Sequence, residues 1–396
     1  MFVLGLDVGG TSSRALLLDA SGRRVGYGKA AGGNPAAHGT EVAAANIGRA
    51  LEPALRGIDP AQVAGAVIGM AGAGALERAV FDLMWASAGL RPAPRVTGDL
   101  GIAFAAGTAE PCGTVLIAGT GAIAARIEDG EPTVIADGLG WLLGDEGSGF
   151  WLGREAARVA ARALSRGEAD GRLVRLVTGA LLEGEVLPDG VHVVRGRGPG
   201  NGAQEREGRP PGNGAKEVQE RSPGNGAQEG QGRSPGNAQE VRERSPKNGE
   251  VLRDGVPEIG AGAAGTLAGM RVLAIKLVIG AQSRPPLELA RLAPLVSQAA
   301  AEGDPAALEI VDTAARLLCR TVAEVRTAEE SGPVVLSGSV LTSEGPVCSA
   351  VRERLGASTV LAGDGAGAAA WLAGREAFGW DPATAARLHK RIVSGG

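Results

Sequence analysis

Short apolar runs alternate with amphipathic segments along most of the chain. Runs rich in Val, Leu, Ile and Ala, bounded by Gly, Asp or Ser, predict β-strands. These runs lie at residues 2–6, 14–19, 23–30, 63–70, 94–97, 114–118, 122–128, 333–337 and 358–361. Apolar residues spaced three or four apart predict helices. These segments lie at residues 41–56, 76–88, 148–165, 304–328, 346–355 and 365–374.

The order of these elements predicts the architecture. Near the N-terminus the order β-β-β-α-β-α-β mixes hairpins with crossover helices, which indicates a mixed sheet with helices on both faces. A similar alternation returns late in the chain. We therefore expect an α/β protein of two lobes with a cleft between them. The first lobe is expected at 1–110 and the second at 111–375, followed by a C-terminal tail at 376–396.

Residues 196–249 break this pattern. They are almost entirely Gly, Pro, Asn, Gln, Glu, Arg and Ser, and Pro-Gly-Asn recurs at 199, 211, 223 and 235. Such a composition cannot bury enough apolar surface to offset the loss of chain entropy, so we expect a disordered insert within the second lobe. A solenoid is the alternative, but these repeats lack a hydrophobic face.

Composition and charge exclude several classes of protein. The chain has 40 Lys and Arg against 44 Asp and Glu, and no basic stripe outside the insert, so no nucleic-acid partner is expected. Its first residues lack a basic n-region, and no apolar run approaches the ~18 residues of a membrane span. The three cysteines and three histidines lack metal-site spacing. We expect a cytoplasmic protein without a membrane partner.

The first candidate chemistry is a Gly-rich turn between two predicted strands. At Gly9 and Gly10, backbone N–H groups can approach a phosphate closely, and Thr11 adds a hydroxyl. Asp7 ends the preceding strand and could hold Mg²⁺ through water. A plain tight hairpin is the alternative. The turn is neither a Walker loop, since no Gly-Lys-Ser/Thr follows, nor a Rossmann fingerprint, since the glycines lead into a strand.

Two further turns of small residues follow predicted strands. Gly119-Thr120-Gly121 joins the strands at 114–118 and 122–128, and together with the first turn it suggests two loops that face one triphosphate. Gly338 and Ser339 follow the strand at 333–337, where a flat ring such as adenine could lie against the backbone. A simple strand-to-helix turn is the alternative there.

Taken together, the motifs resemble those of a known family. The order Asp-x-Gly-Gly-Thr, Gly-Asp-Leu-Gly, Ala-Gly-Thr-Gly, Gly-Asp-Glu-Gly-Ser and Ser-Gly-Ser is similar to that of the N-acetylglucosamine and glucosamine kinases. That family lies within the BadF/BadG/BcrA/BcrD-type ATPases of the actin-like ATPase superfamily. The resemblance covers residues 1–185 and 260–375. It implies a two-lobed ribonuclease-H-like fold, with ATP and Mg²⁺ in the cleft and phosphate transfer to the 6-hydroxyl of a sugar.

The resemblance also implies roles for individual residues. Asp99 follows the strand at 94–97 where these kinases carry the catalytic aspartate, which accepts the proton of the attacking hydroxyl. The residues expected at the nucleotide and its metal are Asp7, Gly9, Gly10, Thr11, Arg14, Gly119, Thr120, Gly121, Gly338, Ser339 and Asp364. Those expected at the sugar are Asn34, Asp99, Gly138, Gly140, Asp145 and Glu146.

Local structure offers an alternative for several of these residues. Asp99 and Asp364 could cap the helices that follow them, and Asn34 could belong to an ordinary Asn-Pro turn. Asp145 and Glu146 could form an exposed acidic turn in front of the helix that Ser148 opens.

The choice of sugar rests on the resemblance as well. The segment Gly-Trp-Leu-Leu-Gly-Asp-Glu-Gly-Ser at 140–148 is most similar to bacterial glucosamine kinases, which favours D-glucosamine, with N-acetyl-D-glucosamine as the alternative. A BadF-type ATPase that drives electron transfer would need paired cysteines for an iron–sulfur cluster. A sugar-binding regulator usually loses the base that Asp99 supplies. The oligomeric state is left open, a homodimer included.

Overall fold

The structure is a computed structural model that describes residues 1–182, 265–327, 329–356 and 358–394. These residues belong to one unit, formed by Met1–Val193 and Glu258–Gly396. The insert expected at 196–249 lies outside the described residues, so its disorder stays a prediction. None of the helices in the described ranges combines the length and apolar character that a membrane crossing requires.

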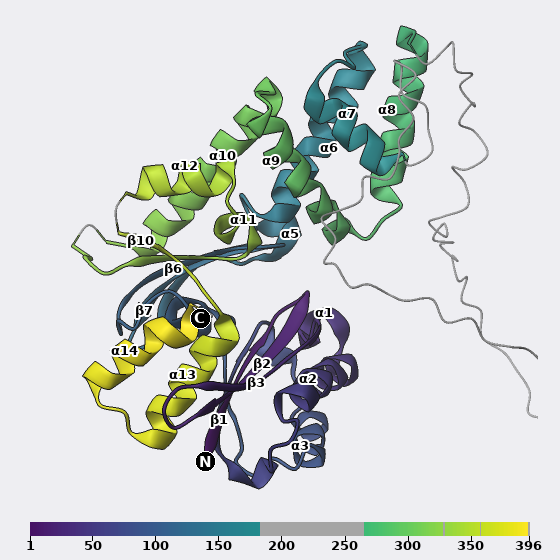
Figure 1. Ribbon diagram of the computed structural model, residues 1–396. Coiled ribbons are helices and arrows are strands. Elements are labelled where there is room, and N and C mark those ends of the chain that lie inside the picture. Colours follow the sequence, from purple (N-terminus) through teal and green to yellow (C-terminus); the bar gives the residue numbers. More distant parts are fainter. Residues whose placement is uncertain (183–264, 328, 357, 395–396) are drawn as a thin grey trace, which may run out of the picture. The chain divides into compact units, whose positions relative to one another are not determined.

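The first sheet is built from the N-terminal strands in the order β3-β2-β1-β4-β5. Figure 1 labels β1, β2 and β3 of this sheet. β1 pairs antiparallel with β2 and parallel with β4. The strands are β1 (Phe2–Val8), β2 (Ser12–Asp19), β3 (Arg24–Ala31), β4 (Val63–Met70) and β5 (Arg95–Thr97). The helices between them are α1 (Pro35–His38), α2 (Thr40–Ala54), η1 (Pro60–Gln62), η2 (Ala73–Ala75), α3 (Arg78–Ser87) and α4 (Asp99–Ala105). The predicted order of strands and helices is confirmed here.

The second sheet repeats the topology of the first. Its order is β10-β9-β6-β7-β8. β6 pairs antiparallel with β7, and β7 pairs antiparallel with β8. β9 pairs parallel with both β6 and β10. The strands are β6 (Gly113–Ala118), β7 (Ala122–Glu128), β8 (Glu131–Asp137), β9 (Val334–Ser337) and β10 (Thr359–Leu361). β6 therefore holds the position that β1 holds in the first sheet. This duplicated arrangement of two five-stranded sheets confirms the predicted α/β fold.

Helices on the second sheet account for most of its core. They are α5 (Gly140–Leu143), α6 (Gly149–Arg166), α7 (Arg172–Leu181), α8 (Leu267–Gln282), η3 (Pro286–Leu292), α9 (Ala293–Ala301), α10 (Pro305–Val325), α11 (Ser339–Thr342) and α12 (Pro346–Leu355). Two predicted helix starts are confirmed. Ser148 Oγ accepts a hydrogen bond from the Trp151 amide at 3.2 Å, and Asp304 Oδ1 accepts one from the Ala307 amide at 3.0 Å.

The last two helices differ from the predicted lobe boundaries. α13 (Gly365–Phe378) and α14 (Pro382–Val393) pack against the first sheet, whereas the sequence places residues up to 375 in the second lobe and treats 376–396 as a tail (Figure 1). Their buried side chains share one core with strand residues of that sheet. This core includes Val3, Leu16, Leu18, Val67, Ala366, Ala370, Leu388 and Ile392. Hydrophobic periodicity shows that a helix has a buried face, but not which sheet covers that face.

Candidate active site

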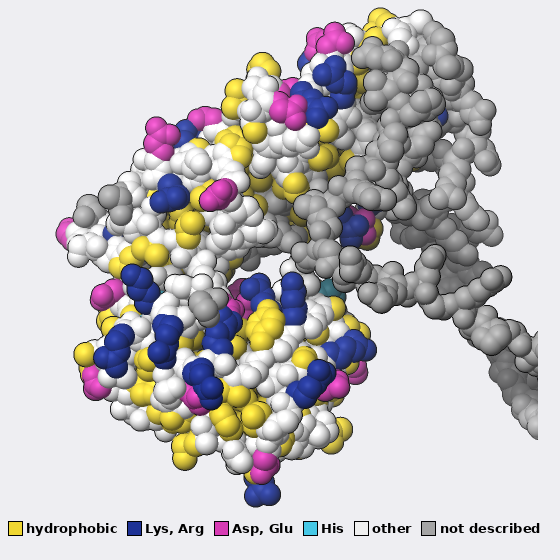
Figure 2. Space-filling view, in the orientation of Figure 1, with side chains coloured by type: hydrophobic (Ala, Val, Ile, Leu, Met, Phe, Trp, Pro, Cys, Tyr) yellow, Lys and Arg dark blue, Asp and Glu magenta, His cyan; other side chains and the backbone are white. Residues whose placement is uncertain are grey.

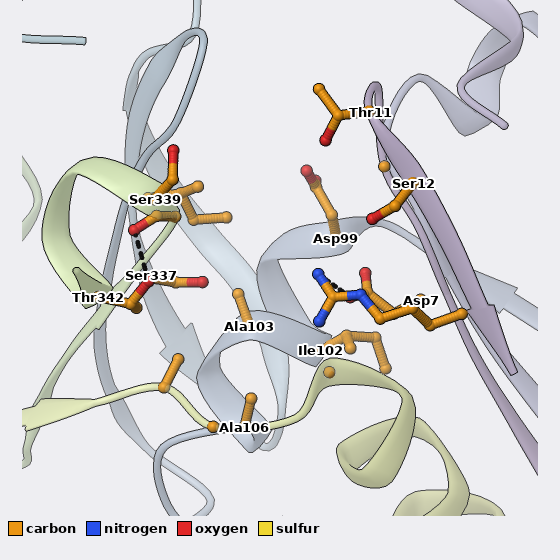
Figure 3. Close-up of a pocket in the computed structure, with 17 residues that line it drawn as sticks. Asp7, Thr11, Ser12, Asp99, Ile102, Ala103, Ala106, Ser337, Ser339 and Thr342 are labelled. Atoms are coloured by element: carbon orange, nitrogen blue, oxygen red, sulfur yellow. Dashed lines mark hydrogen bonds and ion pairs between the residues drawn. The ribbon is translucent and has the colours of Figure 1, made fainter. Parts of the chain in front are cut away.

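A cavity of about 330 Å³ lies among the β1–β2 turn, α4, the end of β9 and the start of α13. Figure 3 shows the Asp99 carboxylate in this cavity, with Ser339 on one side and Thr11 and Ser12 on the other. Residues that are distant in sequence therefore line one space. The predicted site residues that line it are Asp7, Gly9, Thr11, Arg14, Asp99, Gly338 and Ser339.

Asp99 is the first residue of α4, and the N-cap of that helix is Gly98. Helix capping therefore does not account for Asp99. Burial raises the pKa of this carboxyl above its ordinary value, and the backbone amides of Asp99 and Leu100 oppose the rise. A carboxylate with a raised pKa that points into a cavity is a better proton acceptor than one exposed to water.

Asp7 lies beside Arg14, its partner in the register of β1 and β2. Arg14 Nη2 lies 3.7 Å from Asp7 Oδ2. Burial raises the pKa of Asp7, Arg14 lowers it, and the negative charges of Asp364 and Asp99 raise it further. Asp99 and Asp364 therefore lie close enough to act on Asp7, with Arg14 as its cationic neighbour.

A magnesium ion fits this arrangement of carboxylates. Within the described ranges, no group of three or more His, Cys, Asp or Glu side chains could enclose a metal. Mg²⁺ does not need one, because it usually binds through one or two carboxylates, several waters and the phosphates of a substrate. Asp7 lines the cavity and would supply the carboxylate, with the charge of Asp99 nearby.

Asp364 caps a helix, as the local alternative suggested. Its Oδ1 accepts a hydrogen bond from the Ala366 amide at 3.2 Å, and its other oxygen forms an ion pair with Arg24 of β3. Its neighbours Gly363 and Gly365 line the cavity. Asp364 thus holds the start of α13 next to Asp7.

The Gly9–Gly10 turn is held from outside the cavity. Within the turn, the Gly9 amide donates a hydrogen bond to the Ser12 carbonyl at 2.9 Å. The Gly33 amide donates to the Gly9 carbonyl at 3.1 Å, and His38 Nε2 lies 2.8 Å from the Gly10 carbonyl. The segment after β3 therefore fixes the turn while its inner side stays open.

Asn34 is the N-cap of α1 and does not line the cavity. Its Oδ1 accepts hydrogen bonds from the amides of Ala36 at 2.9 Å and Ala37 at 3.3 Å. The side-chain oxygen of Asn34 therefore has the local role that the Asn-Pro alternative predicted, at the start of α1. Its Nδ2 group makes no hydrogen bond to the described residues and remains available to another molecule.

The second Gly-Thr-Gly turn borders a neighbouring cavity of about 290 Å³. The first two amides of α6 hold this turn, since Gly149 donates to the Gly119 carbonyl at 2.7 Å and Phe150 to the Thr120 carbonyl at 3.2 Å. Gly119 and Thr120 line the second cavity, and Ser339 lines both cavities. The two predicted turns thus border adjoining spaces rather than a single one.

The acidic pair between the glycines lies behind this second turn. Asp145 is 8% exposed, and its Oδ1 accepts a hydrogen bond from the Ala122 amide at 3.0 Å. Burial and the charge of Asp137 raise the pKa of Asp145, and the Ala122 amide lowers it. Glu146 forms an ion pair with Arg320 of α10. Neither acid lines the two cavities described above.

The remaining predicted residues belong to these same turns. Gly121 lies against Asp145, because a Cβ on it would meet Asp145 Oδ1 at 2.7 Å. Gly138 and Gly140 have φ values of 71° and 79°, in the left-handed region that favours glycine. They flank Leu139 at the start of α5, and the side chains of Leu139, Leu142 and Leu143 are exposed.

Some residues of the site are absent from the sequence prediction. Asp137 binds the amides of both Asp145 and Glu146, and its position between a strand and Gly138 was a signal for such a role. Residues of η3 and α9 complete the second cavity, and they carry no recognisable motif. They are Ala290, Ala293, Pro294 and Ser297.

Positively charged side chains on the surface near the first sheet would attract an anionic ligand. Figure 2 shows Lys and Arg side chains gathered over the part of the molecule that holds the first sheet, α13 and α14, with acidic side chains among them. Such a distribution favours the approach of an anion even though the whole chain carries a net charge of −4.

Comparison with known proteins identifies a family that matches the N-terminal part of the chain. The model of the BadF/BadG/BcrA/BcrD ATPase family matches residues 4–184. The predicted resemblance to this ATPase family is confirmed. The matched segment holds the Gly9–Gly10 turn, Asp99, the Gly119–Gly121 turn and Asp145. No curated protein has a matching sequence.

Solved structures share the fold at low sequence identity. One is a candidate N-acetylglucosamine kinase from Chromobacterium violaceum, with a TM-score of 0.59, 19% identity, and coverage of 94% of this chain and 98% of that chain. Another is a candidate N-acetylglucosamine kinase from Porphyromonas gingivalis, with a TM-score of 0.52, 15% identity, and coverage of 98% and 99%. At these identities the likeness shows a common fold.

Proposed function

We propose that the protein is an ATP-dependent kinase that transfers a phosphoryl group to the 6-hydroxyl of an amino sugar. The observation that carries this proposal is the Asp99 carboxylate, which points into a cavity between two turns of small residues and has a raised pKa. A match to an ATPase family supports the use of ATP. The names of the two structural neighbours support an amino sugar as the acceptor.

Asp99 would accept the proton of the attacking hydroxyl. Phosphoryl transfer needs little covalent chemistry from the protein, so positioning and charge stabilisation supply most of the rate. A correctly placed base contributes about 10²- to 10⁴-fold. The N-terminus of α4 would keep the carboxylate ionised, because its free amides stabilise negative charge.

The β1–β2 turn would hold the phosphates. Gly9 and Gly10 lack side chains, so their backbone can approach phosphate oxygens, and Thr11 adds a hydroxyl donor. Arg14 lines the same cavity and would offset phosphate charge. Asp7 would hold Mg²⁺ through water, and the metal, when bound, neutralises charge on the phosphates.

The second cavity would take the nucleoside end of ATP. It adjoins the first at Ser339, and its lining of small and apolar residues from α6, η3, α9 and α12 suits a flat ring. Gly338 has a φ of 85°, and a Cβ on it would lie 2.4 Å from the Ala118 carbonyl oxygen. Glycine at this position therefore allows the backbone at the end of β9 to lie close to the end of β6.

Asp145 and Asn34 would hold the sugar. Asp145 Oδ2 accepts no hydrogen bond from the described residues, and Asn34 Nδ2 donates none to them. A carboxylate oxygen and an amide donor are suitable partners for sugar hydroxyls. The resemblance of residues 140–148 favours D-glucosamine as the acceptor. The names of the neighbours favour N-acetyl-D-glucosamine as the alternative.

An ADP-release assay with several sugars tests the proposal. We expect ADP release from ATP and Mg²⁺ with D-glucosamine, less with N-acetyl-D-glucosamine, and little with glucose or mannose. The phosphorylated product should carry its phosphate at the 6-position by NMR. Release of ADP at the same rate without any sugar would point to an ATPase of another kind.

The pH dependence of the reaction should report Asp99. Because its pKa is raised and its ionised form is the active one, kcat/KM should fall as the pH drops through a value above the ordinary ~3.9 of an aspartate. Single-turnover measurements prevent slow product release from masking the fall in rate at acidic pH. Preincubation at each pH shows whether the loss of activity is reversible. A rate that stays constant down to the ordinary aspartate range would contradict the assignment.

A further inference from the structure

Asp137 ends β8 and binds two consecutive backbone amides. Its Oδ1 accepts a hydrogen bond from the Asp145 amide at 2.7 Å, and its Oδ2 accepts one from the Glu146 amide at 3.0 Å. Both oxygens of the carboxylate are therefore engaged. Hydrogen bonds to an ionised acceptor are about twice as strong as those between neutral groups. Asp137 thus ties together the two ends of the segment 138–144, which contains α5.

The backbone at Asp145 needs such a partner. Its φ of 56° lies in the left-handed region, which a residue other than glycine adopts at a cost. This conformation turns the amides of Asp145 and Glu146 toward the same side, which creates a concave site for an anion. The Asp137 carboxylate fills that site and stabilises the left-handed turn.

The left-handed turn sets the direction of the Asp145 side chain. Its Oδ1 binds the Ala122 amide at 3.0 Å, directly after the Gly119–Gly121 turn. Its carboxylate lies against Gly121, where a Cβ would come within 2.7 Å of Oδ1. With Oδ1 engaged and the side chain 8% exposed, Oδ2 is the part of Asp145 left for another molecule.

Gly144 shows how closely Asp137 fits the loop. A Cβ on Gly144 would lie 2.1 Å from Asp137 Oδ1, so the carboxylate occupies the space that a side chain would take. The Gly144 amide itself donates to the Gly140 carbonyl at 2.8 Å. A substitution at Gly144 would therefore disturb Asp137 without removing its charge.

We propose that Asp137 is a positioning residue that directs the Asp145 carboxylate toward the acceptor sugar. The inference rests on the proposed function, because it assigns Asp145 to sugar binding. Asp137 itself acts through two backbone amides. Its loss should therefore weaken the recognition of sugar more than the recognition of ATP.

The experiment compares Asp137→Asn and Asp137→Ala with wild type and with Asp129→Asn. Asp129 is a suitable control because it also has a left-handed backbone, with a φ of 52°, but lies exposed at the β7–β8 turn. We expect the KM for sugar to rise about 10-fold or more in Asp137→Ala and less in Asp137→Asn, which keeps one acceptor oxygen. The KM for ATP should stay within about twofold of wild type, and Asp129→Asn should match wild type throughout.

The outcomes separate this inference from the function on which it rests. A wild-type protein that phosphorylates no sugar would overturn the proposed function. An active wild type whose Asp137 variants keep the normal KM for sugar would overturn the positioning role. Equal increases in both KM values, with a lower melting temperature, would show a structural role and would overturn it too. Gly144→Ala gives a second test, since it should also raise the KM for sugar selectively.

Discussion

Replacing Asp99 by asparagine should lower kcat by about 10²- to 10⁴-fold while ATP still binds. Asparagine has nearly the same shape but cannot accept the proton of the attacking hydroxyl. Gly98, not Asp99, is the N-cap of α4, and asparagine keeps a side-chain oxygen for the amides of Asp99 and Leu100. The loss should therefore be chemical, and single-turnover phosphoryl transfer measures it directly.

The same variant should be at least as stable as wild type at neutral pH. Burial raises the pKa of Asp99 in the folded state, so the stability that this group contributes is lost as the pH rises through that pKa. An asparagine at this position does not ionise, so the variant would not lose that stability. Thermal melting at neutral and acidic pH tests this point, with the exposed Asp82 on α3 as the site of a control substitution to asparagine. Wild-type turnover in Asp99→Asn would remove Asp99 from the mechanism.

Replacing Gly5 by alanine should destabilise the protein by about 1–3 kcal/mol or more. Gly5 lies in the middle of β1, where α13 crosses the strand. A Cβ on it would lie 2.0 Å from the Ala370 nitrogen and 2.4 Å from the Ala366 carbonyl oxygen. These are backbone atoms, so the helix itself would have to move away from the sheet. Chemical denaturation at constant pH measures the change in the free energy of unfolding.

Gly65→Ala is the matched control for this substitution. Gly65 lies in β4 and faces the same helix, but a Cβ there would lie 3.4 Å from the Ala377 Cβ, an ordinary contact distance. We expect its free energy of unfolding to stay within about 0.5 kcal/mol of wild type. A similar small effect at Gly5 would mean that α13 does not approach β1 as closely as described. Because α13 begins beside Asp7, Gly5→Ala should also weaken nucleotide binding.

Local patterns predicted the elements of both sheets well. The strands at 63–70 and 122–128 have the predicted bounds, and Ser148 and Asp304 cap the predicted helices. These features depend on residues close in sequence, where alternation, apolar runs and caps act. By contrast, the attachment of α13 to the first sheet depends on Gly5 and Ala370, two small residues far apart along the chain. Neither has a pattern of its own that reveals the contact.

The residues of the site that could be predicted are those whose reactive side chains lie in recognisable motifs. Asp7, Asp99 and Ser339 come from separate segments and line one cavity. Gly119 and Thr120, predicted to face the same triphosphate, border the adjoining cavity instead. The second cavity was not predicted, because Ala290, Ala293 and Pro294 contribute shape rather than reactive groups. Asp137 was not predicted because it acts on backbone amides, and its place between a strand and Gly138 was the one local signal for such a role.

The attachment of α13 and α14 to the first sheet has a consequence for synthesis on the ribosome. One face of β1, β2 and β4 is covered by residues 365–393, which emerge last of these segments during translation. Until then, Val3, Leu16 and Val67 lack the side chains of α13 and α14 that complete this core, and of the helices made earlier α4 contributes Ile102, Ala105 and Ala106 to it. The half of the molecule made first would thus finish folding after the half made second, and its nascent chain would offer chaperones an apolar surface for most of translation.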